Sequence, residues 1–173
     1  MRATRNDRRF RKAEFFLKEA YRAQRKKKYE DAVDLYRRSI QAWPTAEAYT
    51  FLGWAYSFMD KLDEAIEECR RAIEVDPAFG NPYNDIGSYL IKKGNLREAI
   101  AWLKKAKEAP RYEPRHYPYL NLGRVYMAMG RVEDAQREFA QARFIFDNVV
   151  KAPETPGAEA EAAGESAAAA HLH

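Results

Sequence analysis

Apolar residues recur every three or four positions through most of the chain. Leu52, Ala55 and Tyr56 belong to one such run, and Ala65 and Cys69 begin the next. This spacing places the apolar side chains on one face of an α-helix. Short polar breaks, often containing glycine, separate the runs, and glycine suits a helix end that needs a positive φ. The pattern therefore predicts a succession of amphipathic helices joined by short turns.

The helical pattern is also repeated. The segment 46–79 has counterparts that begin at Gly80 and at His116, and a weaker copy begins at Ala13. Equivalent positions are 33, 34 and 36 residues apart, and the last interval is lengthened in the stretch EAPRYEPRHYP. A fixed period of this length is typical of helical repeat proteins. We predict four helix pairs, in units of about 13–45, 46–79, 80–115 and 116–149, which together form a domain over 13–151.

Small residues recur at fixed places within the units. Gly53, Gly87 and Gly123 occupy equivalent positions in the first helix of units two to four. A glycine at such a position lets a first helix approach its partner closely, and the alternation of small and bulky positions is what a tight helix–helix contact needs. We therefore expect each glycine to lie against the second helix of its own unit.

At these residues the chain resembles the tetratricopeptide repeat family. The family pattern of an aromatic residue, Leu-Gly, Tyr, Ala, an aromatic residue, Ala and Pro is met almost completely by residues 46–79, although Cys69 replaces the second aromatic residue. The resemblance extends over about 13–146 and departs from the pattern at Glu19-Ala20. It implies an all-α, right-handed α-solenoid with a concave groove lined mainly by the first helices, and it implies no enzymatic activity.

Both ends of the predicted array depart from the repeat pattern. Residues 1–12 form a basic extension that leads into the first helix, with Asn6 or Asp7 expected as its N-cap. The last helix is expected to be extended, and the acidic segment 152–173, rich in Ala and Glu, is predicted to be a flexible, disordered tail. An apolar surface near the end of the last helix either folds against the last pair or forms a homodimer contact or docking patch. The residues proposed for that patch are Phe144, Phe146, Val149 and Val150.

Charge is distributed unevenly along the chain. Thirty Lys and Arg oppose 26 Asp and Glu, so the net charge is +4, but residues 1–28 carry twelve cations and three acids. Such a cluster can contact nucleic-acid phosphates, anionic lipid or an acidic protein. No module that reads bases accompanies it, so a solvated helix face is favoured over a nucleic-acid site. Binding of nucleic acid or another polyanion is kept as an alternative.

Residues with catalytic or metal-binding chemistry are sparse. The single cysteine, Cys69, excludes an intramolecular disulfide and any multi-cysteine metal cage, and its position predicts a buried side chain. His116 lies in the lengthened link and is interpreted as a linker residue on the surface rather than a general base. No phosphate-binding loop, zinc-helix motif or nucleophile elbow is present. We expect no enzymatic activity, no cofactor and no metal site, a cytoplasmic location, and no insertion into a membrane.

The groove implied by the resemblance is lined by specific positions of the first helices. Trp54 is the central candidate, because tryptophan and arginine are frequent at binding hot spots. Phe51 and Phe58 are equally interpreted as packing between repeats. The two-carboxylate clamp of some family members is disfavoured, since Leu17 and Tyr21 stand where those proteins have Lys and Asn. The candidate groove residues are Tyr21, Arg25, Thr50, Phe51, Trp54, Phe58, Asn81, Asn84, Ser88, Lys92, Tyr117, Asn121, Arg124 and Met127.

The resulting hypothesis is a non-enzymatic scaffold or adaptor for protein–protein interaction, which binds a partner peptide or segment in the concave groove. A self-associating assembly subunit is the main alternative within the interaction class. The link and the helix after it, APRYEPRHYPYLNLGRVY, also resemble the corresponding part of the tetratricopeptide pilotins of type IV pili. A pilotin-like assembly factor is therefore a further, minor hypothesis.

Overall fold

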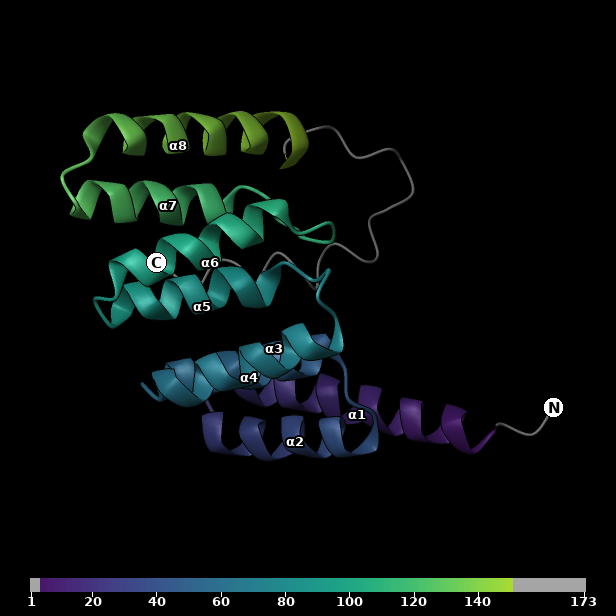
Figure 1. The fold of residues 1–173 in the computed structure, drawn as a ribbon. Helices are drawn as coiled ribbons and strands as arrows, with labels where there is room; N and C mark the ends of the chain where they lie inside the picture. Colours follow the sequence, from purple (N-terminus) through teal and green to yellow (C-terminus); the bar gives the residue numbers. More distant parts are fainter. Residues whose placement is uncertain (1–3, 151–173) are drawn as a thin grey trace.

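The computed structural model describes residues 4–150, with side chains described as far as Asn148, and the predicted flexible tail lies outside this range. Within it, eight α-helices pack as four successive hairpins (Figure 1). The all-α repeat fold is confirmed, and a short π-helix, η1 (Phe146–Val150), continues the last helix. The α-helices are α1 (Arg5–Arg25), α2 (Tyr29–Ala42), α3 (Ala46–Phe58), α4 (Leu62–Val75), α5 (Asn81–Lys92), α6 (Leu96–Glu108), α7 (Tyr117–Ala128) and α8 (Val132–Ile145).

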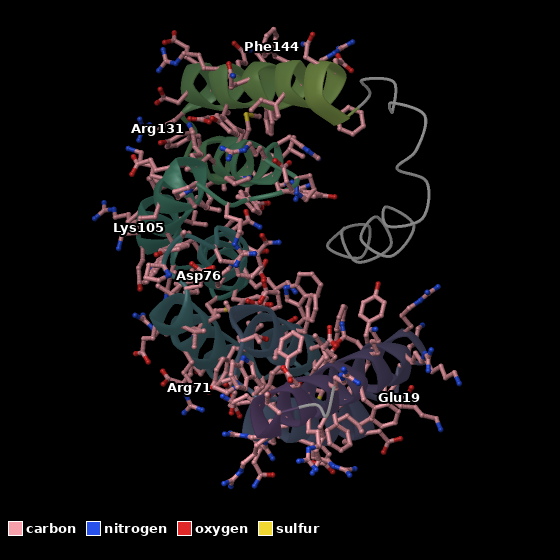
Figure 2. The ribbon with its side chains drawn as sticks, turned by 90° about the vertical axis from the view of Figure 1, so that its right-hand side faces the viewer. Glu19, Arg71, Asp76, Lys105, Arg131 and Phe144 are labelled. Atoms are coloured by element: carbon pink, nitrogen blue, oxygen red, sulfur yellow. The ribbon has the colours of Figure 1, made fainter. Side chains whose placement is uncertain are left out.

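The hairpins stack in chain order, and the stack is curved (Figure 2). Each second helix packs against the first helix of the next unit, as α2 does against α3. The first helices also contact one another, in the pairs α1–α3, α3–α5 and α5–α7, whereas the described second helices make no such contacts with each other. Elements on the inner side of a curved stack lie closer together than those on the outer side. The first helices therefore line the concave side.

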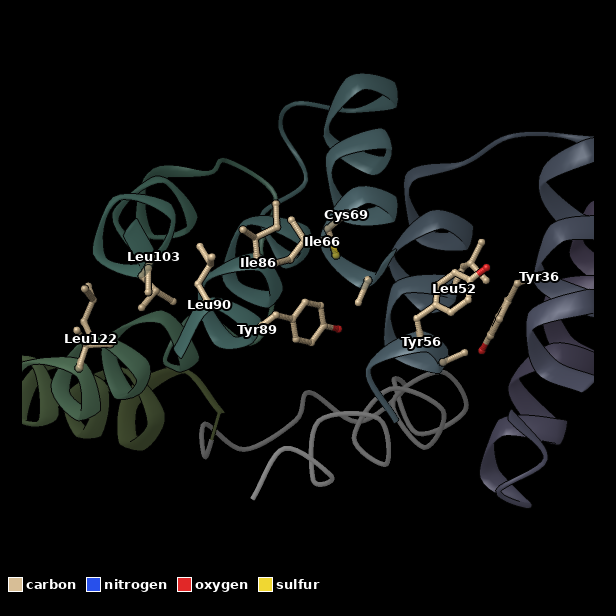
Figure 3. Packing of buried hydrophobic residues seen from close by; sticks show 14 of the residues in the cluster. Tyr36, Leu52, Tyr56, Ile66, Cys69, Ile86, Tyr89, Leu90, Leu103 and Leu122 are labelled. Carbon is tan, nitrogen blue, oxygen red and sulfur yellow. The ribbon is translucent and has the colours of Figure 1, made fainter. Parts of the chain in front are cut away.

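One continuous apolar core runs along the stack (Figure 3). Tyr36, Leu52, Ile86, Leu103 and Leu122 are almost completely buried and follow one another from unit to unit. Each unit covers the apolar surface of its neighbours and cannot bury that surface by itself, as is general for stacked repeats. The concave side is thus supported by a contiguous core rather than by separate small ones.

The recurring glycines do what the pattern predicts. A Cβ added at Gly87 would lie 2.6 Å from the Leu103 side chain on α6, and one added at Gly53 would lie 3.0 Å from the Ala65 carbonyl oxygen on α4. At Gly123 the obstructing group is the ring of Phe139 on α8. In each unit the partner belongs to the second helix of the same hairpin, so the predicted close approach is confirmed.

The turn inside each hairpin uses a left-handed residue at an equivalent position. Gly94 and Gly130 have φ values of 78° and 72°, and Lys27 and Asp60 have values of 58° and 61°. Glycine adopts this conformation without the steric penalty that a Cβ introduces. Units three and four therefore have the residue that the turn favours, while units one and two place a side chain there.

The first helix begins earlier than expected. Thr4 is the N-cap of α1, and its side chain accepts a hydrogen bond from the backbone N–H of Asp7 at 3.1 Å. The Asp7 carboxylate in turn accepts a hydrogen bond from the Thr4 N–H at 2.8 Å, which completes a capping box. The expectation that Asn6 or Asp7 is the N-cap is therefore wrong. The signal that points to the true start is Thr4 with an acid three residues later.

The lengthened link before α7 folds back along the link before α5. Arg111 and the 78–80 segment exchange backbone hydrogen bonds, from Gly80 N to Arg111 O and from Arg111 N to Ala78 O. The Arg111 guanidinium pairs with Glu47 at 2.9 Å and Asp76 at 2.5 Å. This link thus joins units two, three and four. None of the helices in the described part of the chain has the length and apolar character needed to cross a membrane.

Candidate binding face

Aromatic side chains of α1, α2 and α3 meet on the concave side. The Phe51 ring lies 6.2 Å from that of Tyr21, 6.1 Å from that of Tyr36 and 5.0 Å from that of Trp54. Tyr21, Phe51 and Trp54 are half-buried. Ring pairs at these separations add to the stability gained by burial. The cluster joins units one and two and leaves part of each of the three half-buried rings exposed.

Phe58 lies beside this cluster and also joins two units. Its ring stacks on that of Tyr29, with centroids 5.2 Å apart and planes inclined by 13°. The side chain remains 37% exposed. Both Phe51 and Phe58 therefore pack between units, as the packing interpretation of the sequence expects, and both still have area on the surface.

Trp54 is held by a carboxyl group from the next unit. Its indole N–H donates a hydrogen bond to Asp85 Oδ2 on α5. Asp85 is buried, and burial raises the pKa of its carboxyl group to about 7, against the opposing effect of hydrogen bonds from Trp54 and Asn84. The contact fixes the orientation of the indole and links units two and three. Asp85 belongs to the first helix of unit three, and the repeat pattern alone does not predict this contact.

The asparagines expected to bind a ligand are largely occupied with one another. Asn121 Nδ2 donates to Asn84 Oδ1 at 3.0 Å, and both residues are buried. Arg124 extends the chain of hydrogen bonds by donating to Asn121 Oδ1 at 3.3 Å, while its side chain stays exposed. Asn81 is half-buried, and its Oδ1 has no hydrogen-bond partner among the described residues. The network orients Arg124, the member that reaches solvent.

The remaining candidates divide by exposure. Thr50 is completely buried, and its hydroxyl donates to the Ala46 carbonyl oxygen at 2.8 Å, so its side chain does not reach the surface. Ser88 and Tyr117 are half-buried. Together with Phe58, the candidates that are exposed are Arg25, Lys92, Arg124 and Met127.

Exposed charge on the concave side is predominantly positive. Arg25, Lys92 and Arg124 are cations on α1, α5 and α7. Of the acids on the first helices, Glu47 on α3 pairs with Arg111 and Asp85 on α5 is buried. Helix α7 carries none, and those of α1 are Asp7, Glu14 and Glu19. We call the surface formed by Tyr21, Phe51, Trp54, Phe58, Arg25, Lys92 and Arg124 the concave face.

The described part of the last helix buries some of its apolar side chains and exposes others. Ala142 is buried and Phe139 lies against Gly123, whereas Phe144 is 62% exposed. Phe146 makes an edge contact with the ring of His116, with centroids 5.2 Å apart. The side chains of Val149 and Val150, the other two members of the proposed patch, lie outside the described residues. Among the described members of the patch, both Phe144 and Phe146 are exposed, and Phe144 is the more exposed of the two.

The two residues of potential chemical interest are enclosed. His116 is buried beside Tyr117 rather than exposed in its link, and burial lowers the pKa of its imidazole. Cys69 is buried as predicted, and burial raises the pKa of its thiol. A thiol with a raised pKa is a poor nucleophile near neutral pH. The described residues contain no group of three or more His, Cys, Asp or Glu that could hold a metal ion.

Comparison with known proteins places this geometry in a familiar fold. The family model described as "Tetratricopeptide repeat" matches residues 46–79, 81–111 and 117–142, together more than half of the chain. The Small glutamine-rich tetratricopeptide repeat-containing protein 2 of Mycosarcoma maydis is 31% identical over 98 residues, which are 56% of this chain and 28% of that protein. The chain thus spans less than a third of this relative's length, and the matches bring no catalytic domain with them.

Two solved structures show the same architecture. PilF of Pseudomonas aeruginosa superposes with a TM-score of 0.75 at 22% identity, over 81% of this chain and 64% of PilF. The first tetratricopeptide domain of Spaghetti (RPAP3), solved with an HSP90 peptide, superposes with a TM-score of 0.64 at 20% identity, over 70% of this chain and 98% of that domain. At these identities the similarity concerns the fold alone.

Proposed function

The chain belongs to the tetratricopeptide repeat family, whose members mediate interactions between proteins, and from this premise we propose that its concave face binds an extended segment of a partner protein. The chain would act as a non-enzymatic adaptor, and the cytoplasmic location remains part of this proposal. The observation that carries it is the half-exposed aromatic cluster around Trp54, which Asp85 holds in one orientation. A preformed surface of this kind lowers the ordering cost of binding on the adaptor's side.

The chemistry of the concave face favours a particular kind of segment. The rings of Phe51 and Trp54 offer area to an apolar or aromatic anchor. Arg25, Lys92 and Arg124 are exposed on the other first helices and favour carboxylates on the ligand. We therefore expect an acidic segment that carries at least one large apolar side chain. The peptide bound to the RPAP3 domain, SRMEEVD, is acidic, but Leu17 and Tyr21 here disfavour the same mode of carboxylate binding.

A charge-reversal pair tests the proposal without disturbing the aromatic cluster. The variant Lys92→Glu with Arg124→Glu alters two exposed residues of the concave face, and the control Arg97→Glu with Lys104→Glu alters two exposed residues of α6. Both remove the same charge. Affinity capture from the native cell lysate, followed by mass spectrometry, should recover partner proteins with the wild type and the control, and lose them with the concave-face variant. Recovery of the same proteins by both variants would contradict the proposal.

A further inference from the structure

A row of cations follows one side of α1. Most successive side chains are three or four residues apart, and the longest interval, from Lys12 to Lys18, is six residues, so they share one broad face of the helix. All are exposed, and at 1.5 Å per residue the row is about 32 Å long. We call this surface the basic face; it comprises Arg5, Arg8, Arg11, Lys12, Lys18, Arg22 and Lys26, with Phe15 exposed among them.

The basic face forms one end of the stack. In α3, which packs against α2 of the preceding unit, Leu52 and Ala55 are small or apolar and buried. The equivalent residues of α1 are Glu19 and Arg22, which have no preceding described unit to contact. Figure 2 places Glu19 near one end of the stack and Phe144 at the other. A terminal unit needs a polar outer surface, and the basic face supplies one.

A polar outer surface at the end of the stack does not need charges of a single sign, as the opposite end, at α8, shows. On α8 the outer cations have acidic neighbours: Arg137 pairs with Asp134, and Arg143 lies 3.6 Å from an Asp147 oxygen. On the basic face, only Arg22 forms an ion pair with a described acid, Glu19. The end at α1 thus holds a concentration of like charge that its own carboxylates do not neutralise. Such a surface attracts a polyanion.

We propose that the basic face binds the surface of an anionic lipid bilayer. Clusters of four to eight Lys and Arg on one helix face are sufficient for attraction to anionic headgroups. Packing against α2 and α3 covers the opposite side of α1, so the exposed side of this helix can lie along a flat surface. An acidic protein helix is disfavoured, because Glu19 and Arg22 replace the apolar residues that seat a helix in the inner units.

Phe15 provides the apolar part of the proposed contact. Its side chain is 59% exposed and lies in the middle of the row, one turn from Arg11 and Lys18. Aromatic side chains partition into the interface of a bilayer, where the ring enters the headgroup region while neighbouring cations meet the phosphates. No helix inserts in this mode. The protein adsorbs with α1 parallel to the surface, and its concave side remains available to a partner.

Vesicle sedimentation with matched variants tests the proposal. The variant Arg8→Glu, Lys12→Glu, Arg22→Glu removes three cations of the basic face, and the control Arg97→Glu, Lys104→Glu, Lys105→Glu removes three exposed cations of α6. With vesicles of phosphatidylcholine and about one third phosphatidylglycerol, the first variant should bind about tenfold or more weakly than the wild type, and the control within about twofold. Circular dichroism should show the same helical content in all three proteins. Equal loss in the two variants would overturn the proposal.

Two further experiments distinguish binding to a lipid surface from binding to another polyanion. Phe15→Ala should weaken vesicle binding about threefold or more, whereas Phe144→Ala, at a ring of similar exposure on the opposite end, should not change it. A mixed-sequence DNA duplex of about 20 base pairs should bind more weakly than the vesicles at the same salt concentration. Binding to the duplex without binding to the vesicles would overturn the proposal, as would equal binding to vesicles of phosphatidylcholine alone.

Discussion

The concave face and the basic face differ in how their side chains are held. On the concave face, Trp54 is bonded to Asp85, and Arg124 is bonded to Asn121. On the basic face, the cations project from one helix, and among the described acids only Glu19 pairs with one of them. The first surface has fixed geometry and modest charge, and the second has high charge and little fixed geometry. The two are therefore suited to different ligands, one recognised by shape and the other by charge.

This difference shows how one repeat scaffold can present two kinds of surface. An inner helix has neighbours on both sides, so its side chains are fixed by contacts across units. A terminal helix has a neighbour on one side only, and its outer residues are free to vary without disturbing the core. The same position that holds Leu52 in α3 therefore holds Glu19 in α1.

The largest expected effect concerns the carboxyl group that holds Trp54. The pKa of Asp85 is raised from 3.8 to about 7 by burial, so the folded protein retains a proton that the unfolded chain releases. Its contribution to stability is then fully present below about pH 4 and is lost as the pH rises to about 7. From about pH 5 to 7 the free energy of unfolding should fall by about 2 kcal/mol in the wild type relative to Asp85→Asn. Urea unfolding of both proteins measures the difference.

Comparison with Asp85→Asn isolates this group from others that titrate nearby. The asparagine keeps an oxygen that accepts the Trp54 hydrogen bond but carries no ionisable proton. His116, whose pKa is lowered by burial, acts in the opposite direction, because its neutral form is favoured in the folded protein. Its contribution is common to both proteins and cancels in the difference. Parallel stability curves for the two proteins would mean that Asp85 is not held in the way described.

The next largest effect is the difference between the two faces in the salt dependence of binding. Attraction between exposed charges is screened, whereas contact with the aromatic cluster is not. Raising NaCl from about 50 to 300 mM should weaken vesicle binding about tenfold or more, and binding of a concave-face partner less than about threefold. Titration of each ligand in the two buffers checks this ratio. Equal salt dependence at both faces would remove the distinction between them.

The smallest effect concerns the cost of concentrated charge on α1. Arg8 lies four residues before Lys12 and close to the helix N-terminus, where an acid is favoured over a base. Arg8→Glu should therefore raise the free energy of unfolding by about 0.5 kcal/mol while it weakens vesicle binding. Chemical denaturation measures the first quantity and sedimentation the second. If the substitution destabilised the protein, Arg8 would contribute to the fold rather than to the basic face.

The fold could be predicted largely because the repeat imposes the same packing on each unit. Gly53, Gly87 and Gly123 occupy equivalent positions, and each lies against the second helix of its own unit. The turn residues follow the same rule, although Lys27 and Asp60 adopt the left-handed conformation without being glycine. Because the same contact recurs in several units, one unit that departs from the repeat pattern does not obscure it.

Contacts between units were not predictable in the same way. The bond between Trp54 and Asp85 joins different units and has no counterpart in the repeat pattern. Asn84 and Asn121 were expected to bind a ligand, but their amides hydrogen-bond to each other and so serve a structural role. Thr50 was a candidate because of its helix position, but its hydroxyl bonds to the backbone of its own helix. The position of a residue in the repeat tells which side of its helix the residue lies on. Which residue of a neighbouring unit it contacts depends on the curvature of the stack.

Site-specific photo-crosslinking tests the central claim most directly. A photoreactive phenylalanine would replace either Ser88, half-buried on the inner helix α5, or Glu74, exposed on the outer helix α4. With a partner identified by affinity capture, irradiation should give a crosslinked product from the Ser88 position and none from the Glu74 position. A crosslink from Glu74 alone would show that the partner binds the outer side of the stack and would contradict the account.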